Sequence, residues 1–266
     1  MMNTKSFALM ALLLSALMLP LPSVTWADGQ PDVTTFSMDA SFAEVSGPAQ
    51  QGNTEAQNRL GWLYEYGEGG VAKDYKQAMY WLQKSVVQGN AKAQANMGDM
   101  YANGWSVPRD YQQAAVWYQK AAEQGNAYAQ NNLGTLYANG QGVAQDYKQA
   151  FDWYQKAAAQ GDAGAQYNIG TMYQAGQYVA QDYKQAFYWY QKAAEQGQAM
   201  AENNLGAFYG LGTEGVAQDK TKAAYWYSKS AMQGNTDAQE DLEAMYATPD
   251  SGGGSTYVRP VYNHRR

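Results

Sequence analysis

Cysteine is absent from the 266 residues, and the only histidine is His264. Without cysteine the chain has no disulfide, no thiolate metal site and no cysteine nucleophile. Most nucleophile–base pairs and transition-metal sites use histidine or cysteine, and a single histidine near the C-terminus cannot build them. No Gly-x-Ser-x-Gly, phosphate-binding loop or His-Glu-x-x-His motif is present. We therefore expect a protein that is not an enzyme and that binds no cofactor and no metal ion.

Long apolar runs are also missing, except at the N-terminus. There Lys5 precedes an apolar run from Phe7 to Leu19, and small residues surround Ala27. This run is too short to span a bilayer, which favours a signal peptide over 1–27 and leaves an uncleaved membrane anchor as the alternative. We expect an exported protein, periplasmic or secreted, that does not insert into the membrane once the signal is removed.

Basic residues are fewer than acidic ones. Lys5 is the only charged residue of 1–27, so 17 of the 18 basic side chains remain after cleavage against 24 acidic ones, a net charge of −7. The pI of the sequence is near 4.8. Such a chain is a poor partner for nucleic acid or for an anionic membrane surface.

What the sequence does contain is a repeat of 36 or 37 residues. A Gly-Asn pair or a close variant recurs at Gly52, Gly89, Gly125, Gly161, Gly197 and Gly234. Tryptophan recurs with the same period at Trp81, Trp117, Trp153, Trp189 and Trp226. Self-similarity at this period is typical of repeat architectures.

The residue pattern of each repeat predicts two helices. In the first, Ala129, Leu133 and Leu136, like their counterparts, share one face at helical spacing. The mid-helix Gly134 lowers the stability of the helix by about 1 kcal/mol relative to alanine. Its recurrence indicates that a partner helix approaches closely there, where a β-carbon would be in the way. The second helix begins at an N-cap aspartate, followed three residues later by glutamine in four repeats, a capping-box arrangement. We expect its buried stripe to consist of Ala78, Trp81, Leu82 and Ser85 with their counterparts.

One such helix pair cannot bury its own apolar face, whereas stacked neighbours can. We therefore predict an all-α fold, an α/α superhelical solenoid of helix–turn–helix repeats. The predicted segments are a signal peptide (1–27), an N-terminal linker or degenerate cap (28–52), five repeats (53–89, 90–125, 126–161, 162–197 and 198–234), a capping helix (235–247) and a flexible tail (248–266).

The motifs resemble those of a known family. They are Ala-Gln-x-x-Leu-Gly-x-x-Tyr, a Gly-x-Gly-Val loop, Asp-Tyr-Lys-Gln-Ala, Trp-Tyr-x-Lys-Ala-Ala and a closing Gln-Gly-Asn, clearest over 129–161. Over about 190 residues the chain resembles Sel1-like repeat proteins, whose unit is similar to a slightly longer tetratricopeptide repeat. The resemblance implies an α/α superhelix and, in bacteria, exported adaptors, host-interaction factors and some periplasmic immunity proteins. A cysteine-rich branch is linked to penicillin binding and β-lactam hydrolysis, but this chain lacks its cysteines.

Two loops depart from the pattern. Ser106 and Tyr178 stand where the loop glycine is found at Gly70, Gly142 and Gly215. We expect these two loops to follow a different path.

Positions that vary between repeats are where a partner would be recognised. Two sets lie a turn apart on the first helices, one including Tyr128 and the other Trp62, Asp99 and Thr135. Trp62 either anchors a partner or packs against the N-terminal segment. The candidate partner-binding residues are Arg59, Trp62, Asn96, Asp99, Tyr128, Asn132, Thr135, Asn168 and Asn204.

The asparagines among these candidates form a column, with Arg59 in the first place. An amide both donates and accepts hydrogen bonds, so the column suits the backbone of an extended peptide. The alternative is a structural hydrogen bond to a neighbouring helix or loop.

A repeat core with variable inner positions and no catalytic set predicts an exported scaffold or adaptor. It would bind a protein or an extended peptide in its concave groove. The alternatives are a periplasmic immunity protein that neutralises a toxin and, ranked below it, a β-lactam- or cell-wall-acting enzyme. The expected partner is a protein or a peptide, not nucleic acid.

Overall fold

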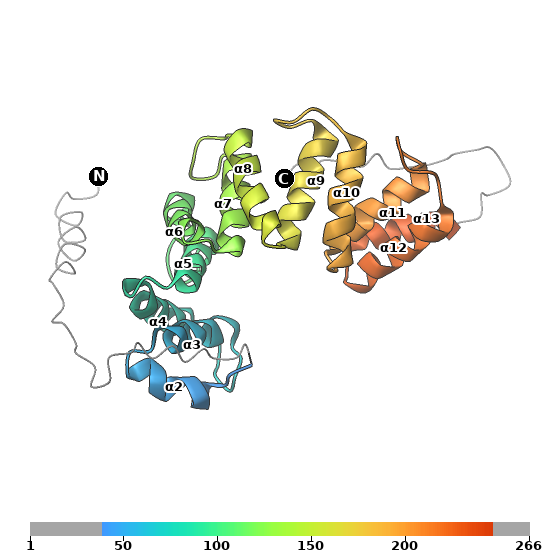
Figure 1. Ribbon diagram of the computed structural model, residues 1–266. Coiled ribbons are helices and arrows are strands. Elements are labelled where there is room, and N and C mark those ends of the chain that lie inside the picture. Colours follow the sequence, from blue (N-terminus) through green and yellow to red (C-terminus); the bar gives the residue numbers. More distant parts are fainter. Residues whose placement is uncertain (1–38, 247–266) are drawn as a thin grey trace, which may run out of the picture. The chain divides into compact units, whose positions relative to one another are not determined.

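The computed structural model describes residues 39–246, and this part of the chain forms twelve helices and no strand. The predicted signal peptide (1–27), residues 28–38 of the predicted linker and the predicted tail (248–266) lie outside the described residues. None of the described helices is long and apolar enough to cross a membrane. The helices in Figure 1 are α2 (Phe42–Gln50), α3 (Thr54–Tyr66), α4 (Tyr75–Val87), α5 (Ala91–Asn103), α6 (Tyr111–Glu123), α7 (Ala127–Asn139), α8 (Tyr147–Ala159), α9 (Ala163–Ala175), α10 (Tyr183–Glu195), α11 (Ala199–Leu211), α12 (Lys220–Met232) and α13 (Thr236–Tyr246).

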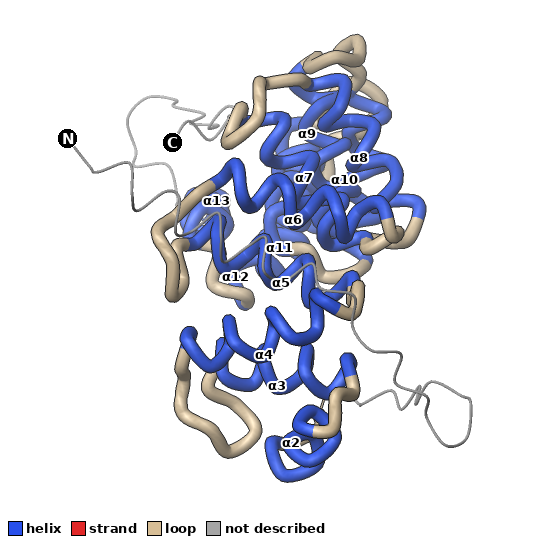
Figure 2. The backbone as a smooth tube through the Cα atoms, turned by 90° about the vertical axis from the view of Figure 1, so that its left-hand side faces the viewer, coloured by secondary structure: helices blue, strands red, loops and turns tan. Residues whose placement is uncertain are grey.

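Consecutive helices pack against each other from α2 to α13, so the helix pairs stack one repeat on the next (Figures 1 and 2). The first helices of the five repeats are α3, α5, α7, α9 and α11, and the second helices are α4, α6, α8, α10 and α12. First helices also touch the next first helix, as α3–α5, α5–α7 and α11–α13 do. The predicted all-α solenoid is confirmed. We call the side of the stack formed by the first helices the inner face.

Each end of the described stack has a half repeat. Helix α2 corresponds to a second helix and packs against α3 through Val45 and Ala49, which are fully buried. Helix α13 corresponds to a first helix, and no second helix follows it within the described residues. Glu243 occupies the place of the mid-helix glycine in α13 and is exposed.

Side chains immediately before the helices cap their free backbone amides. Asp146 accepts a hydrogen bond from the Gln149 amide at 3.0 Å, and the other second helices begin in the same way. The predicted N-cap aspartates are confirmed. The prediction of a full capping box, in which the Gln149 side chain would accept from the Asp146 amide, is wrong. The Asp146 amide donates to the Tyr137 carbonyl, and the Gln149 side chain contacts the Asp146 carboxylate instead. First helices use a cap that sequence analysis did not name, as where Asn126 accepts from the Ala129 amide at 2.8 Å.

The mid-helix glycines let the second helix of the same repeat come close. A methyl group on Gly134 would lie 2.8 Å from the Tyr154 ring, and one on Gly98 would lie 2.5 Å from the Tyr118 ring. Both distances are shorter than a carbon–carbon contact, so the predicted reason for these glycines is confirmed. The side chains that fill the space are buried: Leu82, Tyr118, Tyr154, Tyr190 and Tyr227.

The apolar core lies mainly between repeats. Tyr154 and Ala157 of α8, for example, form one buried cluster with Ala165 and Ile169 of α9, the first helix of the next repeat. The other clusters follow the same pattern, each joining a second helix to the next first helix. A single hairpin therefore leaves one side of its second helix uncovered, which is why stacking stabilises it.

The recurring tryptophans lie at the margin of this core. Trp81 is 9% exposed, but the other four are only half-buried. A lysine three residues later lies over each ring, as Lys156 does with its Nζ 3.8 Å from the Trp153 ring centroid. The prediction that tryptophan belongs to the buried stripe is wrong for these four. The next residue, Tyr154 in this repeat, fills that place because it lies opposite Gly134.

A pair of glutamines connects the two helices within a hairpin, and sequence analysis did not find it. Gln160, after α8, donates from Nε2 to Oε1 of the buried Gln130 in α7 at 2.8 Å. Gln130 in turn donates to the Ala122 carbonyl of the preceding repeat at 3.0 Å. The other pairs are Gln88–Gln57, Gln124–Gln94 and Gln196–Gln166, and in the fifth repeat Gln233–Glu202.

The loops at Ser106 and Tyr178 keep the same turn as their glycine counterpart. Their φ angles are 66° and 64°, close to the 71° of Gly142. A left-handed conformation costs a residue with a β-carbon roughly 1–2 kcal/mol, so the surrounding loop imposes it on Ser106 and Tyr178. The expectation of a different path is therefore wrong for the backbone at this position.

Candidate partner-binding face

The asparagine column lies on the inner face, and two of its amides bond across repeats. Asn96 Nδ2 donates to Asn58 Oδ1 at 3.0 Å, and Asn168 Nδ2 donates to Asn131 Oδ1 at 2.9 Å. Each bond joins a first helix to the first helix of the preceding repeat, α5 to α3 and α9 to α7. These are contacts of the structural kind that sequence analysis left open as the alternative.

The remaining two asparagines have tyrosine partners. Asn132 is hydrogen-bonded to Tyr128, and Asn204 is hydrogen-bonded to Tyr167 and Tyr190. All four asparagines of the column are half-buried, so each side chain keeps some surface open to solvent. Their role in binding a peptide stays a prediction.

Arg59 and Trp62 lie together at the N-terminal end of the inner face. The Arg59 guanidinium carbon is 4.2 Å from the Trp62 ring centroid, and Arg59 Nε donates to the Ala40 carbonyl at 3.1 Å. The Trp62 ring also lies 4.7 Å from the Tyr66 ring. Trp62 is half-buried and packs against the cluster that contains Val45 of α2. Packing against the N-terminal segment is thus present, and the uncovered part of the ring remains available to a partner.

Asp99 is the most buried of the candidate residues, at 8% exposed. Its Oδ1 accepts hydrogen bonds from Tyr118 at 2.5 Å and from Tyr128 at 3.0 Å. Burial raises the pKa of Asp99 to about 6, and the two phenol hydrogen bonds limit that rise. Tyr128, itself 49% exposed, therefore connects a buried carboxyl group to the surface of the inner face.

Glu65 lies near Asp99, and sequence analysis missed it. This side chain, near the end of α3, is only 2% exposed. Burial, and after it the charge of Asp99, raise the pKa of Glu65 to about 7, against the effects of the Tyr66 phenol and Lys73. The signal for it was an acidic residue at a position where the other repeats carry Ala102, Ala138, Gln174 and Gly210.

Thr135 takes part in packing between the helices of its own repeat. Its hydroxyl donates to the Asn131 carbonyl at 3.1 Å and lies 3.2 Å from the Tyr154 hydroxyl. The structure therefore groups the candidates into an Arg59–Trp62 pair and a set around Asp99 that includes Tyr128. Asn168 and Asn204 lie farther along the stack, on α9 and α11.

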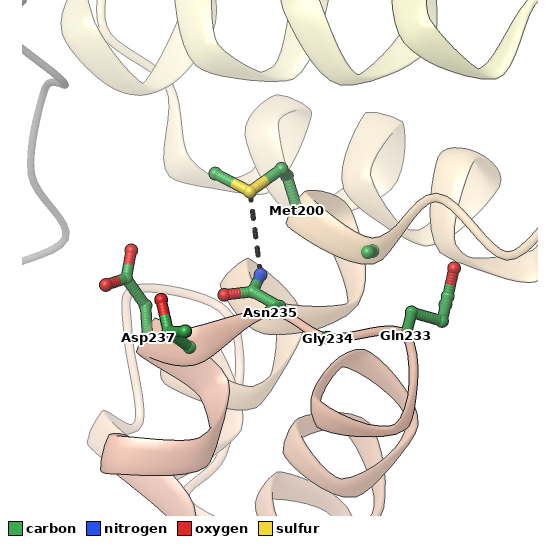
Figure 3. Close-up of a pocket in the computed structure, with 7 residues that line it drawn as sticks. Met200, Gln233, Gly234, Asn235 and Asp237 are labelled. Carbon is green, nitrogen blue, oxygen red and sulfur yellow. Dashed lines mark hydrogen bonds between the residues drawn. The ribbon is translucent and has the colours of Figure 1, made fainter.

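A pocket near the C-terminal end lies apart from these groups. It is lined by the start of α11, the turn before α13 and the first residues of α13, including Met200, Asn235 and Asp237 (Figure 3). Asn235 Nδ2 lies 3.5 Å from the Met200 sulfur, the contact drawn in Figure 3. No candidate residue lines this pocket. Over 39–246 no group of three or more His, Cys, Asp or Glu side chains is placed to hold a metal ion.

Comparison with known proteins gives consistent matches. The family model described as Sel1 repeat matches five consecutive segments, 54–90, 91–126, 127–162, 163–198 and 199–235. A solved Sel1 repeat protein from Oxalobacter formigenes is 38% identical with a TM-score of 0.70, over 77% of this chain and 81% of that chain. A solved immunity protein from Pseudomonas aeruginosa is 25% identical with a TM-score of 0.52, over 74% of this chain and 76% of that chain.

A curated relative matches over a shorter stretch. The ERAD-associated E3 ubiquitin-protein ligase component HRD3A of Arabidopsis thaliana is 32% identical over 66 residues, which are 25% of this chain and 10% of that protein. Proteins with Sel1 repeats generally mediate protein–protein interactions and are typically not enzymes. The five matched segments span well over half of the sequence and coincide with the stacked hairpins. This chain belongs to the Sel1 repeat family.

Proposed function

We propose that this protein is an exported scaffold that binds another protein, or an extended peptide segment, along its inner face. The observation that carries the proposal is the alignment of variable side chains on stacked first helices. Hydrogen bonds between those helices, such as Asn96–Asn58, hold neighbouring positions in register. Trp62 and Tyr128 supply partly exposed aromatic surface on the same face, and aromatic residues are enriched among interface hot spots.

The chemistry of the inner face suits a polypeptide. Helices α7 and α9 contain no charged residue. Their polar residues are mainly amides and hydroxyls, which can donate to and accept from peptide groups. Export is proposed from the leader-like segment 1–27, with its basic residue, short apolar run and small residues near Ala27.

Site-specific crosslinking tests this function. A photoreactive amino acid replaces Trp62 in the full chain, and Tyr188, 47% exposed on the second helix α10, is replaced in a matched control. We expect the Trp62 position to capture a defined protein from the periplasmic or secreted fraction, because it lies on the proposed binding face. Capture of the same proteins at Tyr188, or of none at Trp62, contradicts the proposal.

A second candidate is an immunity function. It is favoured by the shared fold and 25% identity with an immunity protein from Pseudomonas aeruginosa. In that case the protein captured at Trp62 is a toxin, and expression of this chain protects cells that produce it. A captured partner that is not toxic excludes the immunity function and leaves the scaffold function standing.

A further inference from the structure

Two buried acidic side chains meet on the inner face where the first three repeats join. Glu65 comes from α3 and Asp99 from α5, two first helices that touch each other, and the charge of Asp99 raises the pKa of Glu65. Tyr128 of α7 and Tyr118 of α6 donate to Asp99. Tyr66 bonds to Glu65. We refer to these five residues as the acidic cluster.

The acidic cluster is short of one hydrogen-bond donor. Glu65 Oε2 is buried and has no hydrogen-bond partner. None of the ion pairs found over 39–246 involves Glu65 or Asp99. A buried acidic group outside any ion pair is destabilising, and the charge of Lys73 offsets only part of the effect of burial on Glu65. A buried oxygen without a donor adds to that cost.

The repeat framework does not need acids at these two places. The residues equivalent to Glu65 are Ala102, Ala138, Gln174 and Gly210, and those equivalent to Asp99 are Trp62, Thr135, Thr171 and Ala207. The later repeats fold into the same hairpins with these uncharged residues. Asp99 joins α5 to α6 and α7 through its two tyrosine donors, but the hairpin does not require an acid at either position.

We propose that the acidic cluster binds the basic side chain of an arginine or lysine of the partner. This inference rests on the proposed function, since it names the chemistry of the partner at that face. A guanidinium or ammonium group carries the donors that Glu65 Oε2 lacks, and charge-assisted hydrogen bonds to carboxylates are among the strongest in proteins. Its positive charge also offsets the mutual repulsion of two ionised carboxyl groups.

The surroundings of the cluster suit such a side chain. Tyr66 and Tyr128 are 47% and 49% exposed, so each ring extends from the buried acids to solvent. Entry of a cation requires these two hydroxyls to give up their hydrogen bonds to the acids, and the ring faces can then stack on the cation. Cation stacking already occurs next to the cluster, where Arg59 lies 4.2 Å from the Trp62 ring centroid.

Proton release distinguishes this site from general attraction to an acidic protein. In the free protein at pH 6, Glu65 is largely protonated, because burial and Asp99 raise its pKa to about 7. A bound cation favours the ionised form, so binding at pH 6 releases a proton to the buffer. A cation held by exposed carboxylates, which are already ionised, releases none.

The test uses N-acetyl-arginine amide as the probe and the uncharged N-acetyl-citrulline amide as its control. Calorimetry at pH 6, in two buffers of different ionisation enthalpy, measures affinity and proton release for the full chain. We expect saturable binding of the arginine compound with proton release and no binding of the citrulline compound. Glu65→Gln should weaken binding about tenfold or more, as loss of one charged hydrogen bond predicts. It should also reduce the proton release, because only Asp99, whose pKa is about 6, then has a proton to lose at pH 6.

Glu55→Gln is the matched control, since Glu55 is another acid of α3 whose side chain is a third exposed and pairs with Lys92. It should bind like the unmodified chain. Equal weakening by both substitutions, binding without proton release, or no saturable binding overturns the inference. A partner captured at Trp62 without any arginine binding overturns this inference alone. Arginine binding without a captured partner contradicts the scaffold function and leaves the basic-side-chain site.

Discussion

Replacing Tyr154 with alanine is expected to lower the free energy of unfolding by about 3–5 kcal/mol. The ring lies between α7 and α8 against Gly134 and belongs to the cluster that joins α8 to α9. Its loss therefore leaves a cavity at a position that two repeats share. Chemical denaturation followed by far-ultraviolet circular dichroism measures the change.

The neighbouring tryptophan is the matched control. Trp153→Ala removes a larger side chain from the same helix, but the ring is half-buried and Lys156 lies over its face. We expect clearly less destabilisation than for Tyr154→Ala, because less apolar surface returns to water. A loss of stability at Trp153 equal to or greater than that at Tyr154 would show that the tryptophans, and not the tyrosines, form the centre of the hairpin.

Glu65→Gln is expected to stabilise the protein at pH 8 by roughly 3 kcal/mol and to have little effect near pH 4.5. Glutamine resembles the protonated acid, so it fits the same space without a charge. The groups that influence Glu65 are Asp99, Tyr66 and Lys73, and burial is the largest cause of its raised pKa of about 7.

The sign follows from proton binding. Unfolded Glu65 ionises around pH 4.5, whereas folded Glu65 holds its proton to about pH 7, so unfolding between these values releases a proton. The free energy of unfolding therefore falls as the pH rises from about 4.5 to about 7. Melting curves of both proteins across this range measure the difference in stability. The control Glu55→Gln alters an acid of α3 that is a third exposed, and its difference from the unmodified chain should not grow as the pH rises. A constant difference between Glu65→Gln and the unmodified chain at all pH values contradicts the assignment.

The sequence predicted the fold because its signals are local and repeated. The N-cap aspartates and the mid-helix glycines each act within one hairpin. They recur with a period of 36 or 37 residues, so five copies of the same signal support the same prediction. The reason for Gly134 was also correct, since a close approach of helices requires a missing β-carbon. The partner of that glycine was not identified, because Trp153 and Tyr154 are adjacent and both recur with the repeat, the tyrosine in four of the five. Only the rotation of α8 decides which of them faces Gly134.

The candidate site was harder to predict, because contacts between repeats decide its chemistry. Asp99 was singled out as variable, but its two tyrosine donors come from α6 and α7, which spacing along the chain does not place. Glu65 was overlooked since it lies near the end of α3, outside the face first considered. The bond from Asn96 to Asn58 likewise depends on how two first helices align.

The central claim is that one hairpin is unstable alone and becomes stable by stacking. Circular dichroism of a fragment spanning 126–161, beside a three-repeat fragment spanning 90–197, tests it directly. We expect the single repeat to show little helix and no cooperative melting, and the three-repeat fragment to melt cooperatively. A single repeat with full helix content and a cooperative transition would contradict the claim.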